Sequence, residues 1–188
     1  MKHGAAMVLR LTAGASAASI LIAPALAGAT HVFAVRGDVK IGSFAVRADG
    51  SLGGAVRAFG VPSSRRHTYG PGTCTAVWAR HGLTIDFYNL GGADACSPEG
   101  GLFSRAFLRG PHWMTTKRLK VGDGVAKLRT LYPTARLRPG ERYYWPAGYW
   151  LVERTSVIGG GASYPGLLAE VSAGRVLGFQ VRFPAGGD

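Results

Sequence analysis

Residues 76–88, AVWARHGLTIDFY, have the pattern of two antiparallel strands joined by a tight turn. The first four residues are apolar, and the Arg-His-Gly sequence at 80–82 is typical of a turn. After the turn, apolar and polar residues alternate: Leu83, Ile85 and Phe87 with Thr84, Asp86 and Tyr88. Because successive side chains of a strand point to opposite faces, this stretch predicts a β-hairpin with one buried face.

The C-terminal part of the chain has a similar alternation. In residues 176–183, VLGFQVRF, we expect one face to carry Leu177, Phe179, Val181 and Phe183. A turn at 172–175 would join this strand to the one before it. The remaining strands are predicted at residues 102–108, 149–153 and 167–171.

Two short helices are predicted, one ahead of each set of strands. Residues 52–59 carry apolar side chains at helical spacing, with Ser51 as the expected N-cap and Gly60 as the stop. Residues 125–132 have the same spacing, with Asp123 as the expected cap. Each helix would cover one face of the strands that follow it.

The predicted fold class is α+β and mainly β, with two helix-plus-antiparallel-sheet halves packed as one compact unit. The halves would span about 31–113 and 114–188, and residues 63–73 would form a polar loop in the first. An offset of 72 aligns Trp78 with Trp150, although few other residues are identical. An internal duplication is physically sensible, since one short helix over three strands buries too little surface to fold alone.

Residues 1–29 have the pattern of a secretory signal peptide. A weakly basic start precedes an Ala-rich apolar stretch at 11–22, and small residues mark cleavage after Ala27 or Ala29. We therefore expect an exported domain at 30–188, secreted or associated with the cell envelope. The apolar stretch is shorter than the ~20 residues that span a bilayer, so the mature chain would contain no transmembrane segment.

The chain is strongly basic, with a formal net charge of +12. Loss of Lys2 and Arg10 with the signal peptide would leave 20 basic and 10 acidic residues. One interpretation is an anionic partner, such as a wall polymer or lipid. The other is that scattered positive charges keep an exported protein soluble, since the densest groups, 117–120 and 136–138, are short. A nucleic-acid partner is not expected, because its site would concentrate the charge.

Cys74 and Cys96 are the only two cysteines. An even number in an exported chain predicts one disulfide, which by loop-closure entropy would contribute about 3 kcal/mol. A metal site is not expected, because there is no Cys-x-x-Cys pair and no ligand spacing among His31, His67, His81 and His112.

Residues 119–128, LKVGDGVAKL, read as a strand end, a glycine turn and a short helix. With the disulfide and the two-half organisation, this segment resembles the family of β-lactamase inhibitory proteins, and also the outer-membrane assembly lipoproteins. The resemblance implies tandem repeats that form a concave sheet able to grip an enzyme. The chain departs from that family in having one helix per half and one cysteine pair instead of two.

Catalytic motifs are absent from the sequence. There is no Gly-x-Ser-x-Gly elbow, no His-Glu-x-x-His pair, and no base identifiable for Ser163 in its glycine-rich segment. Glycines 159–161 lack the strand and helix that would make them a phosphate-binding loop. We therefore expect neither an enzyme nor a cofactor.

Residues 143–150, YYWPAGYW, are the most aromatic segment of the chain. Alternate side chains of a strand face opposite ways, so not all of these rings can enter a small core. They either form an exposed binding platform or divide between core and loop cover. The candidate binding residues are Tyr143, Tyr144, Trp145 and Tyr149, with Trp113 as a separate candidate.

The sequence thus favours an exported non-catalytic binding protein that recognises or inhibits an extracellular protein. The alternative is a basic binder of anionic envelope polymer or lipid. A secreted hydrolase is the third interpretation.

Overall fold

The computed structural model describes residues 32–37, 39–138, 149–153 and 166–182, of which 149–153 are described by their backbone. The signal-peptide prediction and most of the aromatic segment lie outside these residues. In chain order the elements are β1 Phe33–Arg36, β2 Lys40–Ile41, α1 Leu52–Phe59, β3 Ser64–His67, β4 Thr73–Trp78, the 3-10 helix η1 Ala79–His81, β5 Leu83–Tyr88, β6 Leu102–Arg109, β7 Trp113–Thr115, α2 Val125–Leu131, β8 Arg136–Arg138, β9 Tyr149–Glu153, β10 Leu167–Ser172 and β11 Arg175–Arg182.

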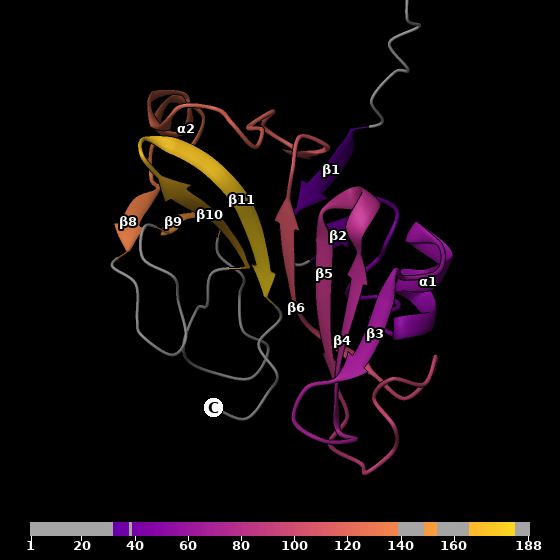
Figure 1. Cartoon of the computed structure of the whole chain (residues 1–188). Coiled ribbons are helices and arrows are strands. Elements are labelled where there is room, and N and C mark those ends of the chain that lie inside the picture. Colours follow the sequence, from indigo (N-terminus) through magenta and orange to yellow (C-terminus); the bar gives the residue numbers. More distant parts are fainter. Residues whose placement is uncertain (1–31, 38, 139–148, 154–165, 183–188) are drawn as a thin grey trace, which may run out of the picture.

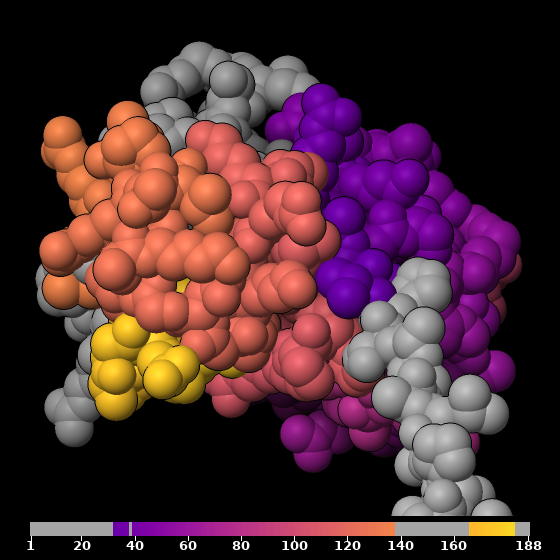
Figure 2. All heavy atoms as spheres, turned by 90° about the horizontal axis from the view of Figure 1, so that it is seen from above, coloured from indigo at the N-terminus to yellow at the C-terminus, as the bar shows by residue number. Residues whose placement is uncertain are grey.

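The protein is mainly β, as predicted, and its principal element is an antiparallel sheet of eight strands (Figure 1). The strand order is β3-β4-β5-β6-β11-β10-β9-β8, so each run of four consecutive strands leads from an outer edge to the centre. A smaller sheet has the order β2-β1-β7, and its β1–β7 pair is parallel. Seen from above, the segment that contains β1 lies beside the segment that contains β7 (Figure 2). Neither helix among the described residues has the length and apolar character needed to cross a bilayer.

Helix α1 forms where the sequence predicts it. The Ser51 hydroxyl accepts a hydrogen bond from the Gly54 N–H at 2.9 Å and donates to Asp49 Oδ1 at 2.7 Å. Gly60 ends the helix with φ +79°, a conformation that glycine adopts without a Cβ clash. Leu52, Ala55 and Phe59 are buried, so the predicted apolar face packs on the core.

The predicted cap of α2 is wrong by one residue. The N-cap is Gly124, which has no side chain to offer, and the helix has no side-chain cap. Asp123 Oδ2 instead accepts from the Lys120 N–H at 2.7 Å and contacts Lys127 Nζ at 2.8 Å. The carboxylate therefore stabilises the turn before the helix and pairs with a lysine on its first turn.

The hairpin of residues 76–88 is confirmed, with β4 and β5 in register from Thr73↔Tyr88 to Trp78↔Leu83. Part of the predicted loop 63–73 is a strand, β3, which pairs with β4. Hydrophobic periodicity could not reveal it, because all four of its residues are exposed.

The prediction for Leu177 is also wrong: its side chain is 44% exposed. Val176 pairs with Val171 and Gly178 with Glu170, which leaves Leu177 as the extra residue of a β-bulge. The bulge reverses the facing of the strand, so Val176 is buried with Phe179 and Val181. Phe183 lies outside the described residues.

A second bulge occupies the matching place in the first half. Phe103 pairs with Phe87 and Arg105 with Asp86, which leaves Ser104 as the extra residue. Two isolated bridges have the same spacing as the bulges. One bridge joins Ser51 to Leu102, and the other joins Gly124 to Arg175. The residues of the second bridge follow those of the first by the same number of positions that separates Leu177 from Ser104.

The two tryptophans that an offset of 72 aligns do not match in the same way. Trp78 pairs with Leu83, whereas Trp150 pairs with Ala169. The two tryptophans therefore do not occupy equivalent positions in the sheet.

One continuous hydrophobic cluster lies between the helices, the smaller sheet and the inner face of the large sheet. Its centre is aromatic: Phe59 contacts Phe33, Trp78 and Trp113, with ring centroids 5.8–6.2 Å apart. The Cys74–Cys96 disulfide, with a Cα–Cα distance of 5.1 Å, ties β4 to the loop that follows β5. The pairing predicted from the cysteine count is therefore present.

Candidate functional site

The alternation that buries one side of each strand leaves the opposite side of the large sheet exposed to solvent in part. We call this side the open face. Inward positions on β4, β5 and β6 are buried, whereas the outward ones are intermediate or exposed. The open face is defined by Thr75, Asp86, Arg105, Phe107, Arg109 and Glu170.

A chain of hydrogen bonds crosses three strands at the centre of the first half. The Thr75 hydroxyl donates to Asp86 Oδ1 at 2.6 Å and also contacts the Thr68 hydroxyl at 2.7 Å. Arg105 Nε donates to Asp86 Oδ2 at 2.7 Å. Both oxygens of the Asp86 carboxylate, which is 19% exposed, are therefore held. Charge-assisted bonds of this kind fix side chains that would otherwise lose rotamer freedom on binding.

Arg105, which takes part in these hydrogen bonds, also covers an aromatic ring. The Arg105 guanidinium carbon lies 5.3 Å from the centroid of Phe107, whose ring is half-buried. This distance suits a cation–π contact. The pair presents a planar cation and an apolar ring together, a combination enriched at the energetic centres of protein interfaces.

A second ion pair spans the centre of the sheet, from β6 to β10. Arg109 Nη2 lies 2.9 Å from Glu170 Oε2, and the Arg109 side chain is 61% exposed. Between them on β11 is Gly178, paired with both residues. A Cβ at this position would lie 3.1 Å from Arg109 Cγ and 2.7 Å from the Leu108 carbonyl oxygen. Because Gly178 has no side chain, the Arg109 side chain can extend over β11 to reach Glu170.

A hollow of about 120 Å³ opens on this face, with Tyr69, Thr73, Tyr88 and Arg105 among its lining residues. Small-molecule sites usually enclose about 300–1,000 Å³. The hollow therefore suits one protruding side chain of a partner rather than an enclosed substrate.

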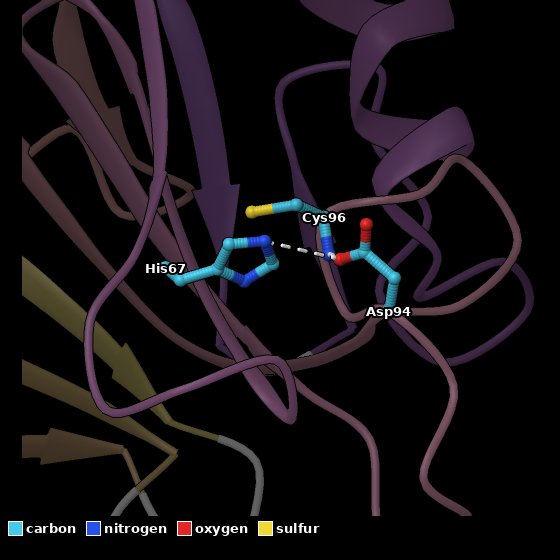
Figure 3. A group of neighbouring side chains, drawn as sticks. All are labelled: His67, Asp94 and Cys96. Carbon is cyan, nitrogen blue, oxygen red and sulfur yellow. Dashed lines mark hydrogen bonds and ion pairs between the residues drawn. The ribbon is translucent and has the colours of Figure 1, made fainter.

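Three potential metal ligands approach one another beside the disulfide: His67, Asp94 and Cys96 (Figure 3). The Cys96 sulfur is bonded to Cys74 and is not a free thiolate. His67 Nε2 lies 3.5 Å from Asp94 Oδ1, and its Nδ1 lies 3.2 Å from the Thr73 carbonyl oxygen. The group thus has too few free ligands for a structural metal, and it fastens β3 to the disulfide loop instead.

The prediction that Trp113 is a binding residue is wrong. Its side chain is fully buried, and its indole Nε1 donates to the His81 carbonyl oxygen at 2.6 Å. The ring packs against Phe33 and Phe59, because the parallel pairing of β7 with β1 places Trp113 beside Phe33 in the core. Local sequence around the His-Trp pair gives no indication of this distant partner.

Of the other predicted candidates, Tyr143, Tyr144 and Trp145 lie outside the described residues. The backbone of Tyr149 is in β9, in register with Glu170.

Sequence reasoning did not assign the open-face residues to a site. The alternation of apolar and polar residues at 83–88 places Asp86 on the outward side of its strand, and this is the one feature of the sequence that indicates an open-face residue. Its partner Arg105 is 19 residues away, and the bulge at Ser104 changes the facing of that strand.

Comparison of the chain with protein-family models, curated proteins and solved structures finds no match.

Proposed function

We propose that this is an exported, non-catalytic binding protein that recognises another extracellular protein through the open face. The observation that carries the proposal is the pre-ordered set of side chains on neighbouring strands, Asp86 with Arg105 and Phe107. Arg, aromatic and held polar groups give large contact area at little cost in rotamer entropy. The shallow hollow beside them fits a side chain of a protein surface.

The two-half organisation supports the same proposal. Helix α1 followed by β3–β6, and α2 followed by β8–β11, bring equivalent last strands to the centre of the sheet. The matching bulges and bridges, related by one constant offset in sequence, favour an internal duplication with halves at about 31–113 and 114–188. This organisation is the one for which the sequence resembles the β-lactamase inhibitory proteins, so inhibition of an extracellular enzyme is a specific form of the proposal.

A basic envelope binder is the second candidate, and one observation favours it. Arg65, Arg66 and Arg80 are exposed and form no ion pair within the described parts of the chain. On the open face, by contrast, Arg105 and Arg109 are already neutralised by carboxylates. A polyanion would therefore bind elsewhere than the open face, and its affinity would fall steeply with salt.

The test is capture by immobilised mature protein from culture supernatant and a cell-envelope extract, with elution in a salt gradient. A double variant, Phe107→Ala with Arg109→Ala, removes two open-face side chains that are not in the core. Arg36→Ala with Leu90→Ala is the matched control, since both side chains are exposed and neither is among the residues that define the open face. We expect one protein to be retained at high salt by the wild type and the control but not by the open-face variant. Release of anionic polymer alone at modest salt, equally from all three proteins, would contradict the proposal.

A further inference from the structure

A second surface lies at the edge of the large sheet, away from the open face. Strand β3 forms this edge, and α1 runs beside it (Figure 1). Between them is a groove of about 460 Å³ whose lining is mainly apolar and includes Leu52, Val56, Val61, Pro62 and Pro98, with Arg65 at its side. We call it the edge groove.

The shape of the edge groove follows from the local contacts of α1. The Gly53 N–H donates to the Pro98 carbonyl oxygen at 2.8 Å, which fastens the disulfide loop to the first turn of the helix. A Cβ on Gly53 would lie 3.1 Å from that oxygen. The helix and the loop are thus held in position, and the space between the helix and β3 is left unfilled by their side chains.

The backbone of β3 has hydrogen-bonding capacity left over. In the described part of the chain it pairs with β4 alone, from Ser64↔Val77 to His67↔Cys74. In an antiparallel pair every second residue directs its N–H and C=O away from the partner strand. All four residues are exposed, and no backbone hydrogen bond joins these outward groups to another described residue. Such an edge is a template for another strand.

The charge around the edge groove is positive. Arg65 and Arg66 project from β3 itself, and neither forms an ion pair with any described residue. Arg57, on the exposed side of α1, is 70% exposed and contacts Asp49. A segment that lies along β3 would therefore meet cations beside the backbone and apolar side chains in the groove.

We propose that the β3 edge and the edge groove bind an extended acidic segment of a partner protein as a ninth strand of the sheet. Alternate apolar side chains of the segment would enter the groove, on the side of Arg65, and the intervening carboxylates would face Arg66 on the other side of the sheet. Backbone hydrogen bonds supply affinity in strand addition, and the pocket for alternate side chains supplies specificity. The groove lies on the side of the sheet that α1 covers, whereas Arg66 is in register with Thr75 at the margin of the open face.

The probe is a capped synthetic hexapeptide of alternating Val and Glu, titrated into the mature protein and followed by ¹H–¹⁵N NMR. We expect shifts confined to β3, α1 and the Pro98 loop. The Val61→Asp variant should bind the peptide at least about tenfold more weakly than the wild type, because the substitution removes an apolar contact and adds a repelling charge. Val61 is 85% exposed, so its replacement does not disturb the core. Leu90→Asp, at an equally exposed position, is the control and should bind like the wild type.

A peptide N-methylated at alternate residues keeps the charges and side chains but loses backbone donors. Loss of its binding would support strand addition. Equal binding of the methylated peptide, or an equal effect of Leu90→Asp, would contradict the proposal. So would absence of binding at millimolar peptide, in which case the two arginines serve to keep the edge unpaired. Sedimentation that shows dimers abolished by Val61→Asp would also overturn it, because a second copy would then occupy the edge.

Discussion

At the scale of single residues, the open face depends on a carboxylate that serves two partners. Asp86 accepts from Thr75 on one neighbouring strand and from Arg105 on the other. The carboxylate is largely buried, so its partners replace water that it would otherwise bind. The Asp86 carboxylate thus fixes the side chains of Thr75 and Arg105 as well as contributing to the stability of the fold.

We expect Asp86→Ala to lower the free energy of unfolding by about 1 kcal/mol, because it leaves Arg105 without its carboxylate. In a double-mutant cycle with Arg105→Ala, the coupling energy should be about 0.5–1 kcal/mol. Urea unfolding of the four proteins measures it. Additive effects of the two substitutions would show that the pair is not formed in solution.

Asp49 gives the protein a pH-dependent contribution to stability. Its pKa is lowered from the ordinary 3.8 chiefly by the hydrogen bond from Ser51, against the opposing effect of partial burial, and with further help from Arg57. A carboxyl whose folded pKa is depressed contributes stability above its unfolded pKa and loses it as the pH falls through the folded value. Asp49→Asn should therefore lower the Tm near neutral pH.

The same variant provides the check on the sign. Thermal unfolding from about pH 7 down to about pH 2 should bring the wild type and Asp49→Asn together at the acid end. A constant difference between them at all pH values would mean that the titration of Asp49 is not responsible.

At the scale of elements, bulges and glycines decide which side chains reach the open face. The bulges at Ser104 and Leu177 change the facing of the two central strands, and Gly178 lets Arg109 cross to Glu170. Helix α1 could be predicted because its cap, apolar spacing and stop are all local. Strand β3 could not, because an exposed edge strand has no apolar alternation.

Gly178→Ala should destabilise the protein by about 1–3 kcal/mol, because its Cβ would lie 2.7 Å from the Leu108 carbonyl oxygen. Gly124→Ala is the control: nothing lies within 4 Å of its added Cβ. Because Gly124 is the N-cap of α2, where alanine is less favourable than glycine, we expect the control to cost about 0.5–1 kcal/mol, less than Gly178→Ala. Chemical denaturation compares the two, and equal effects would show that the strands separate readily at Gly178.

The disulfide acts on the element that carries the candidate site. It closes a separation of 22 residues, and replacement of Cys74 and Cys96 by alanine should cost about 2–4 kcal/mol. Because Cys74 is in β4, the loss should also increase amide exchange at the β3–β4 edge. Hydrogen exchange of the double variant measures both, and unchanged exchange at this edge would contradict the second expectation.

At the scale of the whole molecule, the strands before and after α2 share one core and one sheet. They meet where β6 pairs with β11, and Leu108, Phe179 and Val181 are buried at that junction. The fold class and the β4–β5 hairpin could be predicted from local patterns. The β6–β11 and β1–β7 pairings could not, since each joins segments that lie far apart in the sequence, and the second of them carries Trp113 into the core.

The central claim is that the open face binds an extracellular protein. The most direct measurement is isothermal titration of the captured protein into the wild type and into the Phe107→Ala, Arg109→Ala double variant, at two salt concentrations. We predict that the double variant binds at least about tenfold more weakly than the wild type. Salt should change the affinity of the wild type little. Unchanged affinity of the double variant, or an affinity governed by salt alone, would contradict the claim.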